Sequence, residues 1–280
     1  MQKNERVLGL IAGDGVLPLL IARGAHAAGH RVCCVGLRGQ FAPELPEYCD
    51  AFATAGMARM SRWIRLLQRW GADEAVMAGG VRKAAMHDPL RLLRNIPDLR
   101  SLRLWYRRLR HDRRNATVLA AVADELHRAG VTLIDSTTFI PDHLASGGVL
   151  GSVQPAASQR ADIDFAWPLV QGSSELHIGQ ALAVKEGDVI AVEAVEGTAA
   201  MIRRAGDLCP SGGWTLLKTS PSDQDRRTDV PSIGVDTIDQ MKAAGGSCVA
   251  VGSGRVILLD RPAVLAAADA QGIAVVGVEA

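Results

Sequence analysis

The sequence lacks any long hydrophobic run: none of its 280 residues belong to an apolar stretch of the ~18 residues that a membrane-spanning helix needs. The beginning, MQKNERVLGLIAGDG, also lacks the apolar block and the small-residue cleavage site of a secretory signal. These absences predict a cytoplasmic protein.

Paired cysteines and common catalytic motifs are missing too. The 5 cysteines are odd in number and show no C-x-x-C spacing, so we interpret them as reduced thiols, mainly in the core. They are Cys33, Cys34, Cys49, Cys209 and Cys248. The absence of H-E-x-x-H, of a P-loop and of a G-x-S-x-G elbow argues against zinc-protease, P-loop and serine-hydrolase chemistry.

What is present is an ordinary globular composition, 48% hydrophobic and 22% charged, in a chain long enough for two domains. The net charge of +1 hides an asymmetry. Residues 82–114 carry eleven Lys or Arg against three Asp or Glu, whereas the rest carries twenty against twenty-seven. A basic segment in an otherwise acidic protein indicates an anionic partner.

Short apolar runs alternate with helical patterns in the first half, which favours a parallel sheet covered by helices. We predict strands at 7–12, 31–37, 74–78 and 131–134, with helices at 17–28, 57–70 and 116–129. The fold class is therefore α/β, and residues 1–134 form a Rossmann-like domain.

The composition then changes. Residues 135–162 are rich in Ser, Thr, Pro and Gly and are predicted to be an interdomain linker. Residues 163–280 are predicted to form a second α/β domain with a mixed sheet, because a hairpin pattern surrounds Glu186-Gly187-Asp188 and further strands alternate with helices. Those strands lie at 214–219, 248–251, 256–259 and 273–278, and the helices lie near 237–244 and from Pro262.

Two glycine turns are candidates for binding a phosphate. Gly13-Asp14-Gly15 and Gly79-Gly80 each end a predicted strand, so both lie at the ligand-binding edge if the sheet is parallel. Free backbone N–H groups at such turns suit an anion. The pattern is not G-x-G-x-x-G, and Arg38 stands where a ribose-binding acid would be expected. A tight turn without a ligand is the alternative interpretation.

The basic segment 82–114 interleaves leucines with arginines, as in an amphipathic helix that buries leucines and exposes cations. A solvated face over a core-packed stripe and a membrane-surface site that uses Trp105 and Tyr106 both fit this pattern. Nucleic-acid binding is less favoured, because no recognised nucleic-acid module surrounds the segment.

The most polar stretch is 222–229, which has no apolar residue. Its carboxylates, Asp223, Asp225 and Asp229, alternate with arginines, as in sites that hold Mg²⁺ against phosphate oxygens. Lys218 and Gln224 add a cation and a neutral donor. An exposed loop with local Asp–Arg pairs fits equally well. Further back, Thr198 follows Glu196-Gly197 at a predicted helix start, where it would cap the helix.

At these residues the sequence resembles the LpxI-type UDP-2,3-diacylglucosamine pyrophosphatases of Gram-negative lipid A biosynthesis. The resemblance spans nearly the whole chain and is most specific in Gln224-Asp225-x-Arg227-x-Asp229-x-Pro231-x-x-Gly234. The other matching features are GDGVLP, Gly79-Gly80-Val81, Gly179-Gln180, Glu196-Gly197-Thr198, Arg204-Ala205 and Lys218. One departure is Ala199, where an aspartate would be expected.

The resemblance implies Mg²⁺-assisted hydrolysis of UDP-2,3-diacylglucosamine to UMP and 2,3-diacylglucosamine 1-phosphate (lipid X), with attack at the β-phosphorus. Catalytic roles would fall to Asp225, Arg227 and Lys218, and metal binding to Asp225, Asp223 and Asp229. Substrate binding would fall to Gly13, Asp14, Gly15, Gly79, Gly80, Gln180, Thr198 and Gln224.

The resemblance also favours peripheral association with lipids on the cytosolic face of the inner membrane. A homodimer is a further expectation. Two other classes stay open: an NADP-dependent oxidoreductase that uses the first domain, and a non-catalytic module that binds a sugar nucleotide or phospholipid.

Overall fold

The computed structural model describes residues 6–80, 97–111, 115–227 and 230–279. The chain forms two compact units. Unit 1 comprises residues 1–140 and 225–229, and unit 2 comprises residues 141–224 and 230–280. A short segment from late in the sequence therefore belongs to the first unit, which chain order alone does not indicate.

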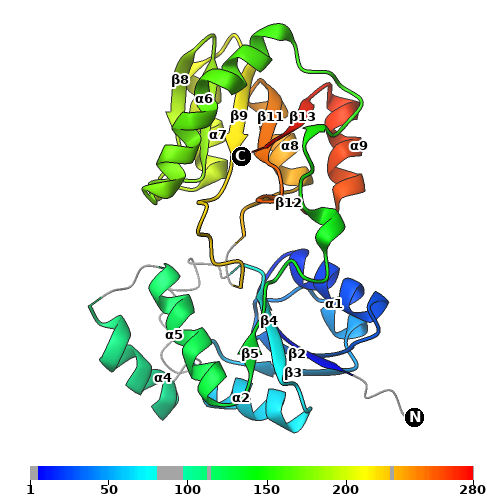
Figure 1. The fold of residues 1–280 in the computed structure, drawn as a ribbon, viewed down its shortest axis with the longest axis vertical. Coiled ribbons are helices and arrows are strands. Elements are labelled where there is room, and N and C mark those ends of the chain that lie inside the picture. The colour runs from blue at the N-terminus through cyan, green and yellow to red at the C-terminus, as the bar shows by residue number, and fades with distance from the viewer. Residues whose placement is uncertain (1–5, 81–96, 112–114, 228–229, 280) are drawn as a thin grey trace. The chain divides into compact units, whose positions relative to one another are not determined.

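Unit 1 is built on a five-stranded sheet with the order β3-β2-β1-β4-β5, in which every pair is parallel (Figure 1). The strands are β1 (Val7–Ala12), β2 (Arg31–Leu37), β3 (Ala51–Ala55), β4 (Glu74–Ala78) and β5 (Thr132–Leu133). The helical elements are α1 (Leu17–Ala27), η1 (Leu45–Tyr48), α2 (Met60–Arg69), α4 (Leu99–Leu104), η3 (Trp105–Leu109) and α5 (Asn115–Arg128). This sheet confirms the predicted α/β class.

Helices α2 and α5 pack on one face of this sheet, and α1 lies on the other (Figure 1). Trp63, Ile64 and Leu67 recur at helical spacing on α2 and are buried in the core below it. Of the basic segment, residues 82–96 and 112–114 lie outside the described residues. The described part matches the expected leucine-burying helix only in part, because Leu104 is buried whereas Leu99 and Leu102 on α4 are 85% and 50% exposed.

Unit 2 contains a six-stranded sheet with the order β6-β13-β11-β9-β7-β8. Its three central strands, β13 (Ala274–Val278), β11 (Gly246–Gly252) and β9 (Trp214–Lys218), are parallel. The outer strands β6 (Gly148–Val149), β7 (Ala181–Lys185) and β8 (Asp188–Val192) pair antiparallel. The predicted mixed sheet and hairpin are therefore confirmed. A separate pair joins β10 (Ser232–Ile233) to β12 (Ile257–Leu258).

The helical elements of unit 2 are η4 (Pro141–His143), α6 (Ala157–Glu175), α7 (Thr198–Leu208), α8 (Val235–Ala243) and α9 (Arg261–Gln271). The region predicted as a linker, 135–162, crosses the boundary between the units and contains both β6 and the first turns of α6. Backbone hydrogen bonds attach part of this region to unit 2. The N–H of Leu150 donates to the Val275 carbonyl, and the N–H of Ala145 donates to the Val256 carbonyl.

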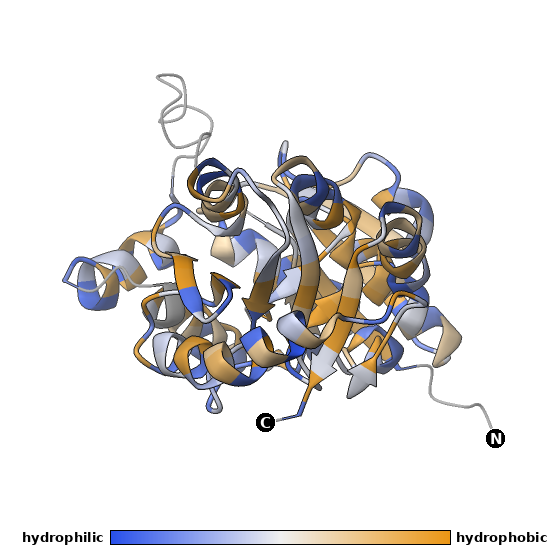
Figure 2. Cartoon of the chain, turned by 90° about the horizontal axis from the view of Figure 1, so that it is seen from above, coloured by the Kyte–Doolittle hydropathy of each residue, from blue (hydrophilic) through white to orange (hydrophobic). Residues whose placement is uncertain are grey.

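The strands are mostly hydrophobic, whereas the helices alternate between hydrophobic and hydrophilic around their circumference (Figure 2). This pattern is expected when helices cover the faces of a sheet. Within the described parts of the chain, no helix is both long enough and apolar enough to cross a bilayer.

Candidate functional site

The two glycine turns of unit 1 lie side by side at the carboxyl edge of its sheet. The N–H of Gly13 donates to the Ala78 carbonyl at 2.8 Å, and Asp14 and Gly80 exchange two backbone hydrogen bonds, each of 2.8 Å. A Cβ atom on Gly79, whose φ is +91°, would lie 2.6 Å from the Gly13 carbonyl carbon. The close approach of two backbones thus explains Gly13 and Gly79 without a ligand, and the phosphate-binding role of both turns stays a prediction.

Asp225 and Arg227 form a close ion pair in unit 1. Arg227 donates from Nε to one carboxylate oxygen at 2.8 Å and from Nη2 to the other at 2.7 Å. This pairing holds the pKa of Asp225 below its ordinary value and raises the pKa of Arg227. Asp225 is therefore a carboxylate at neutral pH, and it is a weak base.

The backbone at Arg226 fixes this segment to unit 1. The Arg226 carbonyl accepts hydrogen bonds from Ser136 N at 3.0 Å and from Ser136 Oγ at 2.8 Å. Ser136 is only 3% exposed, so the anchor is shielded from solvent. Sequence reasoning missed Ser136, because a serine in a Ser- and Thr-rich stretch carries no distinguishing pattern.

The predicted metal ligands do not form a complete site in the described residues. Both oxygens of Asp225 bind Arg227, and Asp223 is exposed. Asp229 lies outside the described residues. No group of three or more His, Cys, Asp or Glu side chains suited to a metal occurs in the part of the chain that the structure describes. Mg²⁺ binding therefore stays a prediction, and we derive no catalytic step through it.

Lys218 occupies the carboxyl end of β9 in unit 2 and is only 7% exposed. Its Nζ donates to Thr198 Oγ1 at 3.2 Å and to the Ser232 carbonyl at 2.8 Å. Thr198 in turn donates to Glu193 Oε1 at 3.0 Å. The hydroxyl of Thr198 thus links Lys218 to Glu193 in a partly buried hydrogen-bond network. The expectation that Thr198 caps α7 is wrong, since Gly197 is the N-cap residue.

Glu193, which accepts the hydrogen bond of Thr198, was not among the site residues predicted from the sequence. Its Oε2 atom is buried and has no hydrogen-bond partner among the described residues. A single acidic residue just after a strand carries no recognisable pattern, and only the structure shows that Glu193 contacts Thr198.

The remaining predicted residues lie near these groups in sequence. The Gln180 carbonyl accepts from Thr219 N at 2.9 Å, and Gln224 N donates to the Pro221 carbonyl at 3.3 Å. Ala199 is exposed in the first turn of α7 and supplies no carboxylate where the family resemblance led us to expect one.

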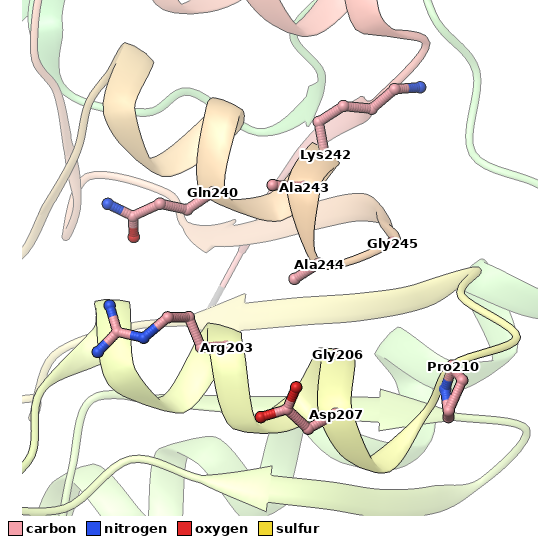
Figure 3. Close-up of a pocket in the computed structure, with 9 residues that line it drawn as sticks. All are labelled: Arg203, Gly206, Asp207, Pro210, Gln240, Lys242, Ala243, Ala244 and Gly245. Atoms are coloured by element: carbon pink, nitrogen blue, oxygen red, sulfur yellow. The ribbon is translucent and has the colours of Figure 1, made fainter.

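One groove of unit 2 lies between α7 and α8, with a volume of about 660 Å³ (Figure 3). Arg203 and Asp207 line it from α7, and Gln240 and Lys242 line it from α8 (Figure 3). None of the predicted site residues lines it. We therefore do not assign this groove to the candidate site.

Comparison with known proteins shows the family to which the chain belongs. Residues 7–143 match the LpxI N-terminal domain, and residues 146–276 match the LpxI C-terminal domain. The chain belongs to the LpxI family. One relative is the UDP-2,3-diacylglucosamine pyrophosphatase LpxI of Caulobacter vibrioides, which is 35% identical over 282 residues, covering 98% of each chain.

Among solved structures, a biotin carboxylase complex from Campylobacter jejuni is 13% identical, with 73% of this chain and 42% of that chain covered. Its TM-score of 0.23 is too low to support an inference about fold or function.

We predict that Arg227→Ala raises the pKa of Asp225, because the guanidinium that stabilises the charged form is lost while the burial remains. Since the folded-state pKa of Asp225 is depressed, its pairing stabilises the fold above the ordinary pKa of an aspartate, and this contribution is lost as pH falls. Carboxyl ¹³C NMR titration measures the change. Arg204→Ala, which removes the partner of Glu196 in unit 2, is the control. An unchanged Asp225 titration in Arg227→Ala would contradict the assignment.

We predict that Gly79→Ala destabilises the protein more than Gly15→Ala. Both residues have positive φ, +91° and +101°, so each alanine costs ~1–3 kcal/mol of backbone strain. Only at Gly79 does the new Cβ also meet backbone atoms, whereas nothing lies within 4 Å at Gly15. Urea unfolding of both variants checks the difference, and equal midpoints would show that the two turns are not held in close contact.

Proposed function

We propose that this protein hydrolyses the diphosphate of UDP-2,3-diacylglucosamine to UMP and 2,3-diacylglucosamine 1-phosphate. The observation that carries the proposal is the match to the Caulobacter vibrioides pyrophosphatase over 98% of both chains. Water adds to a phosphorus, the bridging P–O bond breaks, and the proton from water leaves to solvent or to the departing phosphate.

The chemistry requires groups that offset negative charge on the phosphate oxygens and that align the water. Arg227 carries a permanent positive charge, and it holds Asp225 in one orientation through two hydrogen bonds. Because the pKa of Asp225 is depressed, we propose that its carboxylate orients the water rather than removing a proton near neutral pH, and that it would be one of the oxygen ligands of Mg²⁺.

In unit 2 we propose that Lys218 supplies a cation for phosphate oxygens and that Thr198 and Gln180 orient the sugar phosphate. Support for Lys218 comes from its position at the carboxyl end of a central parallel strand, the edge at which such sheets bind ligands. Its hydrogen bonds to Thr198 and Ser232 hold the ammonium group in place. We propose that Gly13, Asp14, Gly15, Gly79, Gly80 and Gln224 contribute to substrate binding.

Asp225→Asn is expected to fold normally and to lose at least ~100-fold in turnover, because the neutral amide keeps the shape but loses the charge that aligns the reacting groups. Phosphorus NMR of UDP-2,3-diacylglucosamine in detergent follows both binding and cleavage. Asp164→Asn, at an exposed position on α6, is the matched control. Near-full activity of Asp225→Asn would remove Asp225 from the mechanism, and a bound but uncleaved substrate with the native protein would favour the binding-module alternative.

Excess chelator is expected to abolish turnover, and added Mg²⁺ is expected to restore it, since carboxylate oxygens are the ligands that Mg²⁺ prefers. The same reaction in ¹⁸O-labelled water reports which phosphorus is attacked. Label in 2,3-diacylglucosamine 1-phosphate indicates the β-phosphorus, and label in UMP indicates the α-phosphorus. Turnover that is insensitive to chelator would rule out the metal requirement.

A further inference from the structure

A cluster of cations lies at the carboxyl edge of the unit 1 sheet, beside the ends of β2 and β3. Four arginines line a pocket of about 270 Å³. They are Arg38, Arg59, Arg62 and Arg65, and we call this set the arginine pocket. Arg38 follows strand β2, whereas the other three stand at three-residue spacing at the start of α2.

The charge in the arginine pocket is almost entirely of one sign. Among the residues that the structure describes, Asp98 is the only carboxylate that lines it, and it accepts hydrogen bonds from Ser101 N at 2.8 Å and from Ser61 N at 2.6 Å. Burial by itself would raise the pKa of Asp98, but these donors outweigh it and lower the pKa. Within the described residues none of the four guanidinium groups forms an ion pair.

Local bonds orient two of these arginines without using their terminal nitrogens. Arg62 donates through Nε to the Thr54 carbonyl at 3.1 Å, and Arg65 donates through Nε to the Ser61 carbonyl at 3.2 Å. The positive end of the α2 dipole adds to the potential of the pocket. A phosphate group fits this chemistry, because guanidinium groups bind phosphate oxygens through paired N–H donors.

Exposed apolar side chains begin directly beside the pocket. Asp98 is the N-cap of α4, which lies next to α2 (Figure 1). Leu99 is 85% exposed, and Leu102 and Tyr106 follow at spacings of three and four residues with exposures of 50% and 62%. Arg103 and Arg107 on the same continuous helix are also exposed. Apolar side chains flanked by cations are typical of helices that lie in the interface of an anionic membrane.

We propose that unit 1 binds the surface of an anionic phospholipid bilayer, with the arginine pocket taking a lipid headgroup phosphate while Leu99, Leu102 and Tyr106 enter the interface. The charge of the pocket selects the phosphate, and the neighbouring apolar side chains select a lipid over a soluble phosphate ester. This inference does not rest on the proposed hydrolysis, because it concerns residues outside the catalytic assignment.

Flotation of the full-length protein tests the proposal. At low salt the protein is expected to float with vesicles of phosphatidylcholine mixed with phosphatidylglycerol, and not with phosphatidylcholine alone, and added salt should reduce the binding. The double variant Arg59→Gln/Arg62→Gln should bind about 25-fold more weakly, at about five-fold for each arginine near an anionic surface. Arg62→Lys, which keeps the charge, should retain most of the binding.

The double variant Leu99→Ser/Leu102→Ser is expected to weaken vesicle binding without changing its salt dependence. Arg203→Gln and Leu208→Ser, at exposed positions on α7 of unit 2, are the matched controls and should float like the native protein. Thermal unfolding verifies that each variant is folded. If one arginine double variant fails to fold, Arg38→Gln/Arg65→Gln replaces it.

Three results would overturn the proposal. The first is no flotation with anionic vesicles at low salt, and the second is flotation that the arginine variants leave unchanged. The third is that the native protein does not bind vesicles but binds glycerol 1-phosphate or UMP in calorimetry, and that the arginine variants lose this binding. That last result would assign the pocket to a soluble phosphate ester. The flotation experiment contains no UDP-2,3-diacylglucosamine, so a negative result would contradict membrane binding and leave the proposed hydrolysis untouched.

Discussion

The parallel pairing of the central strands is the constraint on which the rest of the structure depends. Parallel strands place all their carboxyl ends at one edge of a sheet, so residues far apart in sequence meet there. In unit 1 this edge brings Gly13 beside Gly79 and places Arg38 one strand away. In unit 2 the same constraint places Lys218 and Gly252 at the ends of adjacent strands.

Each candidate polar group is held by a local hydrogen-bond network. In unit 1 the Asp225–Arg227 pair stands on a backbone whose Arg226 carbonyl is held by Ser136. In unit 2 Lys218 is held through Thr198 and the Ser232 carbonyl. A buried ammonium or a paired carboxylate is stable only when such partners replace water, so the networks are a condition for keeping these charges in place.

Short apolar runs between turn residues are the elements of this protein that the sequence pattern predicts most accurately. Strands β1, β2 and β4 were predicted with their observed bounds, because each is a short apolar run between turn residues. Helix α6 was missed. Its Pro168 and small polar residues obscure the helical pattern, although Ile163, Ala166, Trp167 and Val170 pack in the core. Leu99 and Leu102 were expected to be buried, but hydrophobicity alone does not reveal which side of a helix has a partner.

The sequence by itself determined the α/β class, the order of the main elements and, through residues 7–143 and 146–276, membership of the LpxI family. It also left open a loop with local Asp–Arg pairs, and the structure shows one such pair, between Asp225 and Arg227. Only the tertiary structure decided that residues 225–229 belong to the first unit and that four arginines share one pocket. Those facts depend on backbone contacts between segments far apart in the chain, such as that of Arg226 with Ser136, and no local pattern records such contacts.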